Sequence, residues 1–181
     1  MIIITMVSCL RHATETAYAP SPRLVAIDTL MHTRPDSALT LLLDSTVDDP
    51  YYQLLLSEAL YKNDYAQTNR NELLDAMGYF DSINDPFLSA RCHYMNGVGY
   101  YEMDSVVLAC QEYMKALEIM EERFPEKELI GYKAKFMALT YSHLCALFSE
   151  QYLPEQTIYF GKKALSFIID TPPSLGIFHG V

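Results

Sequence analysis

The stretch from residue 90 to residue 120 combines small residues and tyrosines at a spacing typical of two closely packed helices. Gly97 is followed three positions later by Tyr100, and Ala109 is followed four positions later by Tyr113. In a pair of antiparallel helices, a small residue lets the backbones approach while a ring fills the neighbouring groove. The stretch therefore predicts a helical hairpin with Gly97 and Ala109 at the contact between its two helices.

This spacing resembles the second half of a tetratricopeptide repeat (TPR): a small residue, Tyr three later, Ala nine after that, and an aromatic residue four further on. Ala116 extends the match by three positions. The usual Trp and Leu of the first helix are replaced by His93 and Asn96, and the late Pro by Glu121. The resemblance thus covers one good repeat and implies a fold of stacked helical hairpins.

Prolines preceded by capping side chains mark the starts of several helices. Ser21, Asp49 and Asp85 each stand directly before a proline. Proline suits the first helical position, and the Ser or Asp side chain caps the free N–H groups of the first turn. Caps and apolar periodicity together predict helices at residues 22–32, 35–44, 50–62, 72–81, 86–103, 105–123, 126–150 and 154–169.

Two further segments carry parts of the repeat. Ala26 and Ala38 have the same separation as Gly97 and Ala109, and Cys145 begins a second spaced series. The first of these segments also resembles the opening repeat of envelope-associated bacterial TPR proteins. The resemblance implies an all-α fold, a right-handed α-α superhelix forming a TPR-like solenoid of about four helical hairpins. We assign a leader and tether to residues 1–19, the helical domain to 20–170 and an irregular tail to 171–181.

Charge and motif content exclude several classes of function. The net charge is −10 and no basic run occurs, which argues against nucleic acid and against an anionic membrane surface as partners. The cysteines lack metal-site or redox-motif spacing, and no phosphate loop or nucleophile elbow is present. Neighbouring Cys92 and His93, or His143 and Cys145, point in different directions from a helix and cannot form a dyad there. We expect no enzyme activity, cofactor or metal.

The N-terminal residues favour a lipid anchor. Met6, Val7 and Ser8 precede Cys9 as in a bacterial lipobox, in which the Cys becomes the lipidated first residue of the mature chain. The alternative is an apolar N-terminus with an ordinary free Cys, because the basic residues of a complete signal peptide are missing. The prediction is lipidation at Cys9 and a lipid-anchored protein of the bacterial cell envelope, with a cytoplasmic protein as the alternative.

The resemblance implies that the first helix of each repeat lines a concave groove. The predicted ligand-binding residues, from the best repeat and from the last repeat, are Arg91, Tyr94, Val98 and Tyr101, and Leu139, Ser142 and Ala146. We predict a non-enzymatic module that holds a peptide or protein segment through apolar and aromatic contacts. The alternatives are a lipid-anchored envelope component that binds glycan or peptidoglycan fragments, and the sensor part of a truncated TPR-containing regulator.

The C-terminal hairpin raises the possibility of self-association. Ile158, Leu165 and Ile168 supply apolar surface to the last predicted helix, and the prolines and glycines after residue 170 disfavour another helix. A terminal repeat without a polar capping helix leaves an apolar strip exposed. We therefore expect this hairpin to contact the tail or a second copy of the chain.

Overall fold

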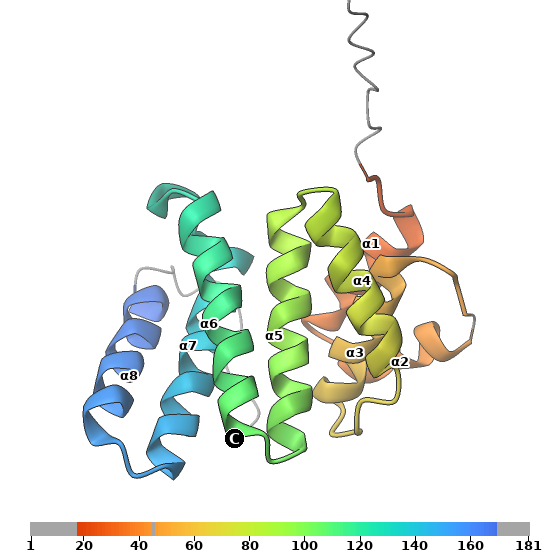
Figure 1. The fold of residues 1–181 in the computed structure, drawn as a ribbon. Coiled ribbons are helices and arrows are strands. Elements are labelled where there is room, and N and C mark those ends of the chain that lie inside the picture. The colour runs from red at the N-terminus through yellow and green to blue at the C-terminus, as the bar shows by residue number, and fades with distance from the viewer. Residues whose placement is uncertain (1–17, 45, 170–181) are drawn as a thin grey trace, which may run out of the picture.

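The structure is a computed structural model that describes residues 18–44 and 46–169, and every regular element in that part of the chain is helical (Figure 1). In chain order the elements are α1 (Pro22–Met31), α2 (Pro35–Leu43), α3 (Pro50–Lys62), α4 (Arg70–Ser82), α5 (Pro86–Glu102), α6 (Val106–Arg123), the 3₁₀ helix η1 (Glu126–Glu128), α7 (Tyr132–Glu150) and α8 (Pro154–Ile169). The all-α prediction is confirmed. Among the described residues, no helix is long and apolar enough to cross a membrane. The lipobox with Cys9 and the tail at 171–181 lie outside the described residues, so the lipid anchor stays a prediction.

The predicted caps explain where three of these helices begin. Ser21, Asp49 and Asp85 each accept a hydrogen bond from a backbone N–H in the first turn of their helix, at 3.3, 2.7 and 3.1 Å. In each case a proline follows the cap, where its missing N–H is not needed. Because this signal is local, α1, α3 and α5 begin at the predicted residue.

The seventh helix differs from its prediction. The sequence predicts one helix from residue 126 to 150, but the structure has the short η1 and then α7, which begins at Tyr132. Gly131 separates them with φ +57°, a left-handed conformation that interrupts a helix and that glycine adopts without a Cβ clash. The connection from α6 to α7 is therefore longer than predicted.

The hairpin of α5 and α6 packs as its small residues predict. A Cβ added to Gly97 would lie 2.7 Å from two ring carbons of Tyr113 and 3.3 Å from the carbonyl oxygen of Ala109. The Tyr113 ring thus occupies the space that the missing side chain leaves, and it is only 1% exposed. In the hairpin of α7 and α8, a Cβ at Gly161 would lie 3.3 Å from the Cys145 Sγ.

Helix α5 lies at the centre of the molecule, between α4 and α6 in the ribbon view (Figure 1). Every residue from Leu88 to Gly99 is buried, including Arg91, His93 and Asn96. A helix that is buried all round has no solvent face, so its polar side chains need partners inside the protein. Arg91 finds carboxylates on α1 and α3, and His93 finds one on α6.

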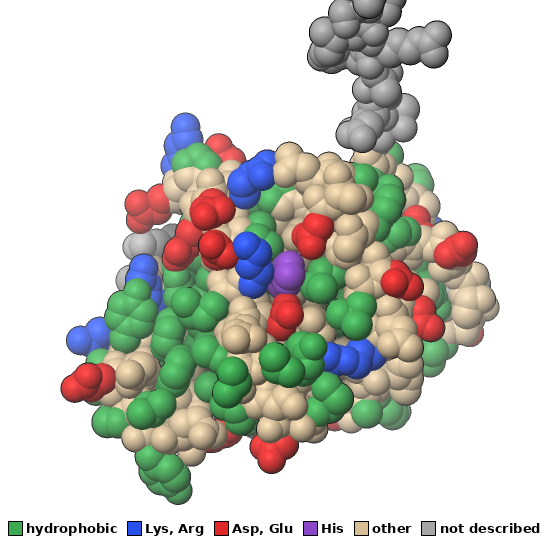
Figure 2. Space-filling view, in the orientation of Figure 1, with side chains coloured by type: hydrophobic (Ala, Val, Ile, Leu, Met, Phe, Trp, Pro, Cys, Tyr) green, Lys and Arg blue, Asp and Glu red, His purple; other side chains and the backbone are tan. Residues whose placement is uncertain are grey.

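The outer surface of the C-terminal half is rich in exposed apolar side chains. Val107 and Met114 on α6 and Ile158, Tyr159 and Leu165 on α8 are all exposed. In the space-filling view, apolar side chains gather over these two helices on the left of the molecule (Figure 2). This surface lies on the opposite side of α6 and α8 from their buried faces.

Candidate ligand-binding cavity

The predicted groove residues of α5 differ in exposure and in whether they line a cavity. Arg91 is 1% exposed and Val98 is 2% exposed, so neither side chain is accessible to a ligand. Neither residue is therefore part of the candidate site. Tyr94 is buried but lines a cavity. Tyr101 is 38% exposed, and its hydroxyl donates to Glu150 Oε1 at 2.6 Å. The four residues share one helix face, but α5 is buried from Leu88 to Gly99, and of the four only Tyr94 lines the cavity.

The predicted groove residues of α7 also differ in whether they line this cavity. Leu139 is half-buried and lines the same cavity as Tyr94. Ser142 is half-buried, and its hydroxyl donates to the Ala138 carbonyl of its own helix at 2.8 Å. Ala146 is exposed and does not line the cavity. The structure therefore brings together Tyr94 and Leu139 of the seven predicted residues.

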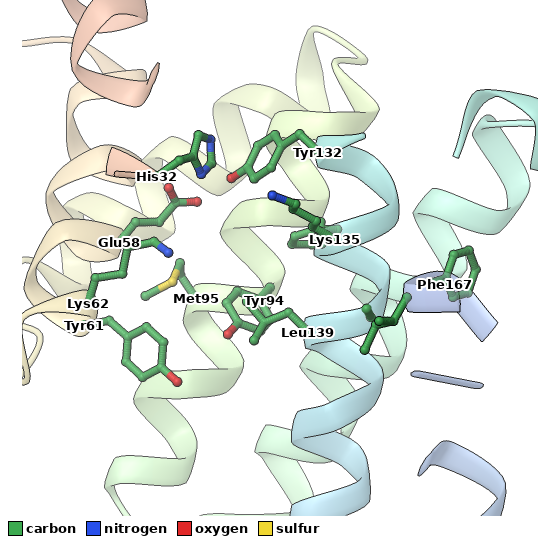
Figure 3. Close-up of a pocket in the computed structure, with 13 residues that line it drawn as sticks. His32, Glu58, Tyr61, Lys62, Tyr94, Met95, Tyr132, Lys135, Leu139 and Phe167 are labelled. Carbon is green, nitrogen blue, oxygen red and sulfur yellow. The ribbon is translucent and has the colours of Figure 1, made fainter. Parts of the chain in front are cut away.

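The cavity has a volume of about 290 Å³ and lies between α3 and α7, with α5 behind it (Figure 3). Its apolar lining comes from Met95 on α5, from α7 and from the end of α8. Its polar lining comes from His32, α3 and α7. The lining residues are His32, Glu58, Tyr61, Lys62, Tyr94, Met95, Tyr132, Lys135, Phe136, Ala138, Leu139, Phe167 and Ile168. The first helices of three successive pairs thus meet around one hollow.

A buried charge cluster fixes one wall. Arg91 donates to both carboxylate oxygens of Glu58, at 2.8 and 2.6 Å, and to both oxygens of Asp28, at 3.1 and 2.8 Å. The Tyr51 hydroxyl also donates to Asp28, at 2.5 Å. Burial alone raises the pKa of Asp28, but the charge and hydrogen bonds of Arg91 outweigh it and hold that pKa below its usual value. The cluster joins α1, α3 and α5, and it occupies both oxygens of the carboxylate that lines the cavity.

A second polar cluster joins four helices around His143. The hydroxyls of Tyr61 on α3 and Tyr94 on α5 each lie 3.1 Å from His143 Nε2, and the hydroxyl of Tyr113 on α6 lies 3.2 Å from Nδ1. Burial lowers the pKa of His143 to about 4, so the imidazole is neutral at pH 7. A neutral imidazole has one N–H donor and one acceptor nitrogen. Sequence reasoning missed this cluster, since His143 is separated in the chain from all three tyrosines.

Two lysines bring positive charge to the cavity. The amines of Lys62 and Lys135 point from α3 and α7 into the space between these helices (Figure 3). Within the described part of the chain, neither amine has an ion-pair partner, whereas Lys115 pairs with Glu118 at 2.7 Å. His32 packs edge-on against Tyr132, with ring centroids 4.3 Å apart, and burial lowers its pKa. The amines are thus unpaired cations beside an apolar hollow.

Burial also affects the free thiol of α5. Burial raises the pKa of the Cys92 thiol well above its usual value, which keeps the thiolate, the reactive form, scarce. Across residues 18–44 and 46–169, no three His, Cys, Asp or Glu side chains are placed to hold a metal ion.

The chain matches no protein-family model, and neither a curated protein nor a solved structure is significantly similar to it. Function is therefore inferred from the shape and side chains of the cavity.

Proposed function

We propose that this chain is a non-enzymatic protein-interaction module that holds a peptide or protein segment in the cavity between α3, α5 and α7. The observation that carries the proposal is a hollow with apolar walls, lined by the first helices of three successive helix pairs, with Lys62 and Lys135 among its polar groups. Ligand sites in proteins commonly combine apolar walls with a small number of placed polar groups. We further propose that the helix pairs form a TPR-like right-handed superhelix.

The size of the cavity favours an anchor side chain over a whole ligand. Pockets that enclose a drug-sized molecule hold roughly 300–1,000 Å³. The volume of about 290 Å³ lies just below that range. One or two apolar side chains of a bound segment fit such a space, while the rest of the segment follows the surface between α3 and α7.

Binding can be tested with a displayed library of random dodecapeptides selected against the purified protein. Leu139→Glu places a charged side chain at the apolar wall and is expected to weaken binding of the selected peptides about tenfold or more, because the carboxylate loses hydration inside the hollow. Leu43→Glu is the matched control, since Leu43 is exposed on α2 and is not one of the residues that line the cavity. Helical circular dichroism of both variants checks that the fold is retained.

Two results contradict the proposal. One is a selection that yields no peptide with saturable binding. The other is a set of peptides that bind wild type, Leu139→Glu and Leu43→Glu equally well, which places their contacts elsewhere on the protein.

A further inference from the structure

The neutral His143 ring carries one N–H hydrogen and the three tyrosines carry one hydroxyl hydrogen each. These four hydrogens are one more than the three nitrogen–oxygen contacts of the cluster can use. Tyr113 is almost fully buried, and among the described residues its hydroxyl meets no acceptor other than His143 Nδ1. If the Tyr113 hydroxyl donates to Nδ1, the neutral ring carries its own hydrogen on Nε2, which donates to the Tyr94 oxygen. The Tyr61 oxygen lies at the same 3.1 Å from Nε2 and therefore also faces a donor in this arrangement. Among the described residues, the hydroxyl hydrogen of Tyr61, which lines the cavity, is then left without an acceptor.

The charged residues at the cavity also provide more hydrogen-bond donors than free acceptors. The amines of Lys62 and Lys135 have no ion-pair partner among the described residues, and an ammonium group can only donate. Glu58, the carboxylate in the lining, already binds Arg91 through both oxygens. Together with Asp28 and a neutral His32, these groups leave one net positive charge around the cavity, in a protein whose formal net charge is −10.

We propose that the cavity selects an acidic peptide segment, with a carboxylate next to a bulky apolar side chain. The carboxylate accepts hydrogen bonds from Lys62, Lys135 and Tyr61, and the apolar side chain packs against Met95 and Leu139. Charge-assisted hydrogen bonds are stronger than neutral ones, and the apolar wall reduces competition from water. This inference rests on the proposed peptide-binding function and adds the chemical class of the ligand.

The chain's own tail does not match this chemistry. Helix α8 ends beside the cavity, where Phe167 and Ile168 contribute to the lining. Residues 171–181 offer Leu175, Ile177 and Phe178 but contain no Asp or Glu. The tail therefore lacks a carboxylate side chain for the two lysines, and an acidic partner fits the charge of the site better.

A pair of fluorescent probes separates the charge requirement from the apolar one. Anilinonaphthalene sulfonate is an aromatic anion, and N-phenyl-naphthylamine is its uncharged analogue. Wild-type protein is expected to bind the anion more tightly than the analogue. Lys62→Gln/Lys135→Gln is expected to weaken binding of the anion about tenfold or more and to leave the analogue unchanged. The matched control Lys133→Gln/Lys162→Gln removes the same charge outside the cavity lining and is expected to bind both probes like wild type.

The peptide selection gives the second arm. We expect the selected dodecapeptides to be enriched in Asp or Glu beside Leu, Phe or Tyr, and replacing the acidic residue by its amide should weaken them to a similar degree. If peptides bind in the cavity but show no acidic preference, the inference is wrong while the proposed function stands. If the anion binds in a lysine-dependent way but no peptide does, the peptide function is wrong.

Two further outcomes overturn the inference directly. One is equal loss of anion binding in the cavity variant and in the Lys133/Lys162 control, which assigns the effect to net charge. The other is a full-length chain that binds neither probe until residues 171–181 are removed, which makes the tail the occupant of the cavity.

Discussion

His143 illustrates how one residue can connect helices that lie far apart in the chain. Its ring is contacted by hydroxyls from α3, α5 and α6, and it belongs to α7. All four groups are polar, yet they lie at a helix junction where each finds a partner inside the protein. An ion at this position would lose its hydration without gaining a carboxylate, which explains why burial lowers the pKa of the imidazole to about 4.

The first prediction concerns the pH dependence of stability that follows from His143. Its folded pKa of about 4 lies below the ordinary value of 6.5, so the unfolded chain binds the extra proton between these two pH values. Protonation therefore favours unfolding, and stability falls as the pH is lowered through this window, by roughly 3 kcal/mol for a shift of this size. Urea unfolding at pH 6.5 and at pH 4 should show this loss in wild type and a smaller one in His143→Gln. Equal losses in the two proteins would show that other groups account for the pH dependence.

At the scale of helices, the contact between α5 and α6 depends on an absent side chain. Gly97 lies in the middle of α5, where glycine costs about 1 kcal/mol of helix stability relative to alanine. The compensation is the Tyr113 ring, which packs where the Cβ of any other residue would lie. Because the ring is buried and held at its hydroxyl by His143, it has little room to move aside.

The second prediction uses two glycines of opposite expected sign. Gly97→Ala places a Cβ 2.7 Å from the Tyr113 ring and should destabilise the protein by about 1–3 kcal/mol, because the overpacking outweighs the gain in helix propensity. Gly78→Ala is the control on α4, where a new Cβ meets nothing within 4 Å, and it should stabilise by roughly 0.5–1 kcal/mol. Chemical unfolding of both variants gives the two signs. A stabilised Gly97→Ala protein would contradict the packing of this hairpin.

Elements and local contacts could be predicted from this sequence, whereas only Tyr94 and Leu139 of the predicted groove residues line the cavity. Caps and prolines act within a few residues, which is why α3 and α8 have the predicted bounds. The repeat resemblance placed Arg91 in a groove, but Arg91 is buried because α1 and α3 supply its carboxylates. Such partners are dozens of residues away, and no pattern within one helix indicates them.

At the scale of the whole molecule, charge and apolar surface are distributed unevenly. The protein is acidic overall, but the cavity is lined by two lysines that form no ion pair with any other described residue. The apolar surface over α6 and α8 lies outside the cavity lining except at the end of α8 (Figure 2). Apolar side chains on an outer helix face are a common mark of an interaction surface. The two regions therefore call for separate tests.

The last prediction is self-association through the C-terminal hairpin. Ile158 and Leu165 are 56% and 55% exposed and lie seven residues apart, on one face of α8. Stacked helical hairpins gain stability by covering such apolar faces. Sedimentation velocity should show a sedimentation coefficient that rises with protein concentration in wild type.

Ile158→Lys/Leu165→Glu should remain monomeric with unchanged helical circular dichroism, because charged side chains lose hydration if the face is buried. Val25→Lys/Leu43→Glu changes two exposed apolar residues of α1 and α2 and should still associate. A wild-type protein that sediments as a monomer at every concentration would contradict self-association. If the control pair also abolished association, the contact would lie away from α8.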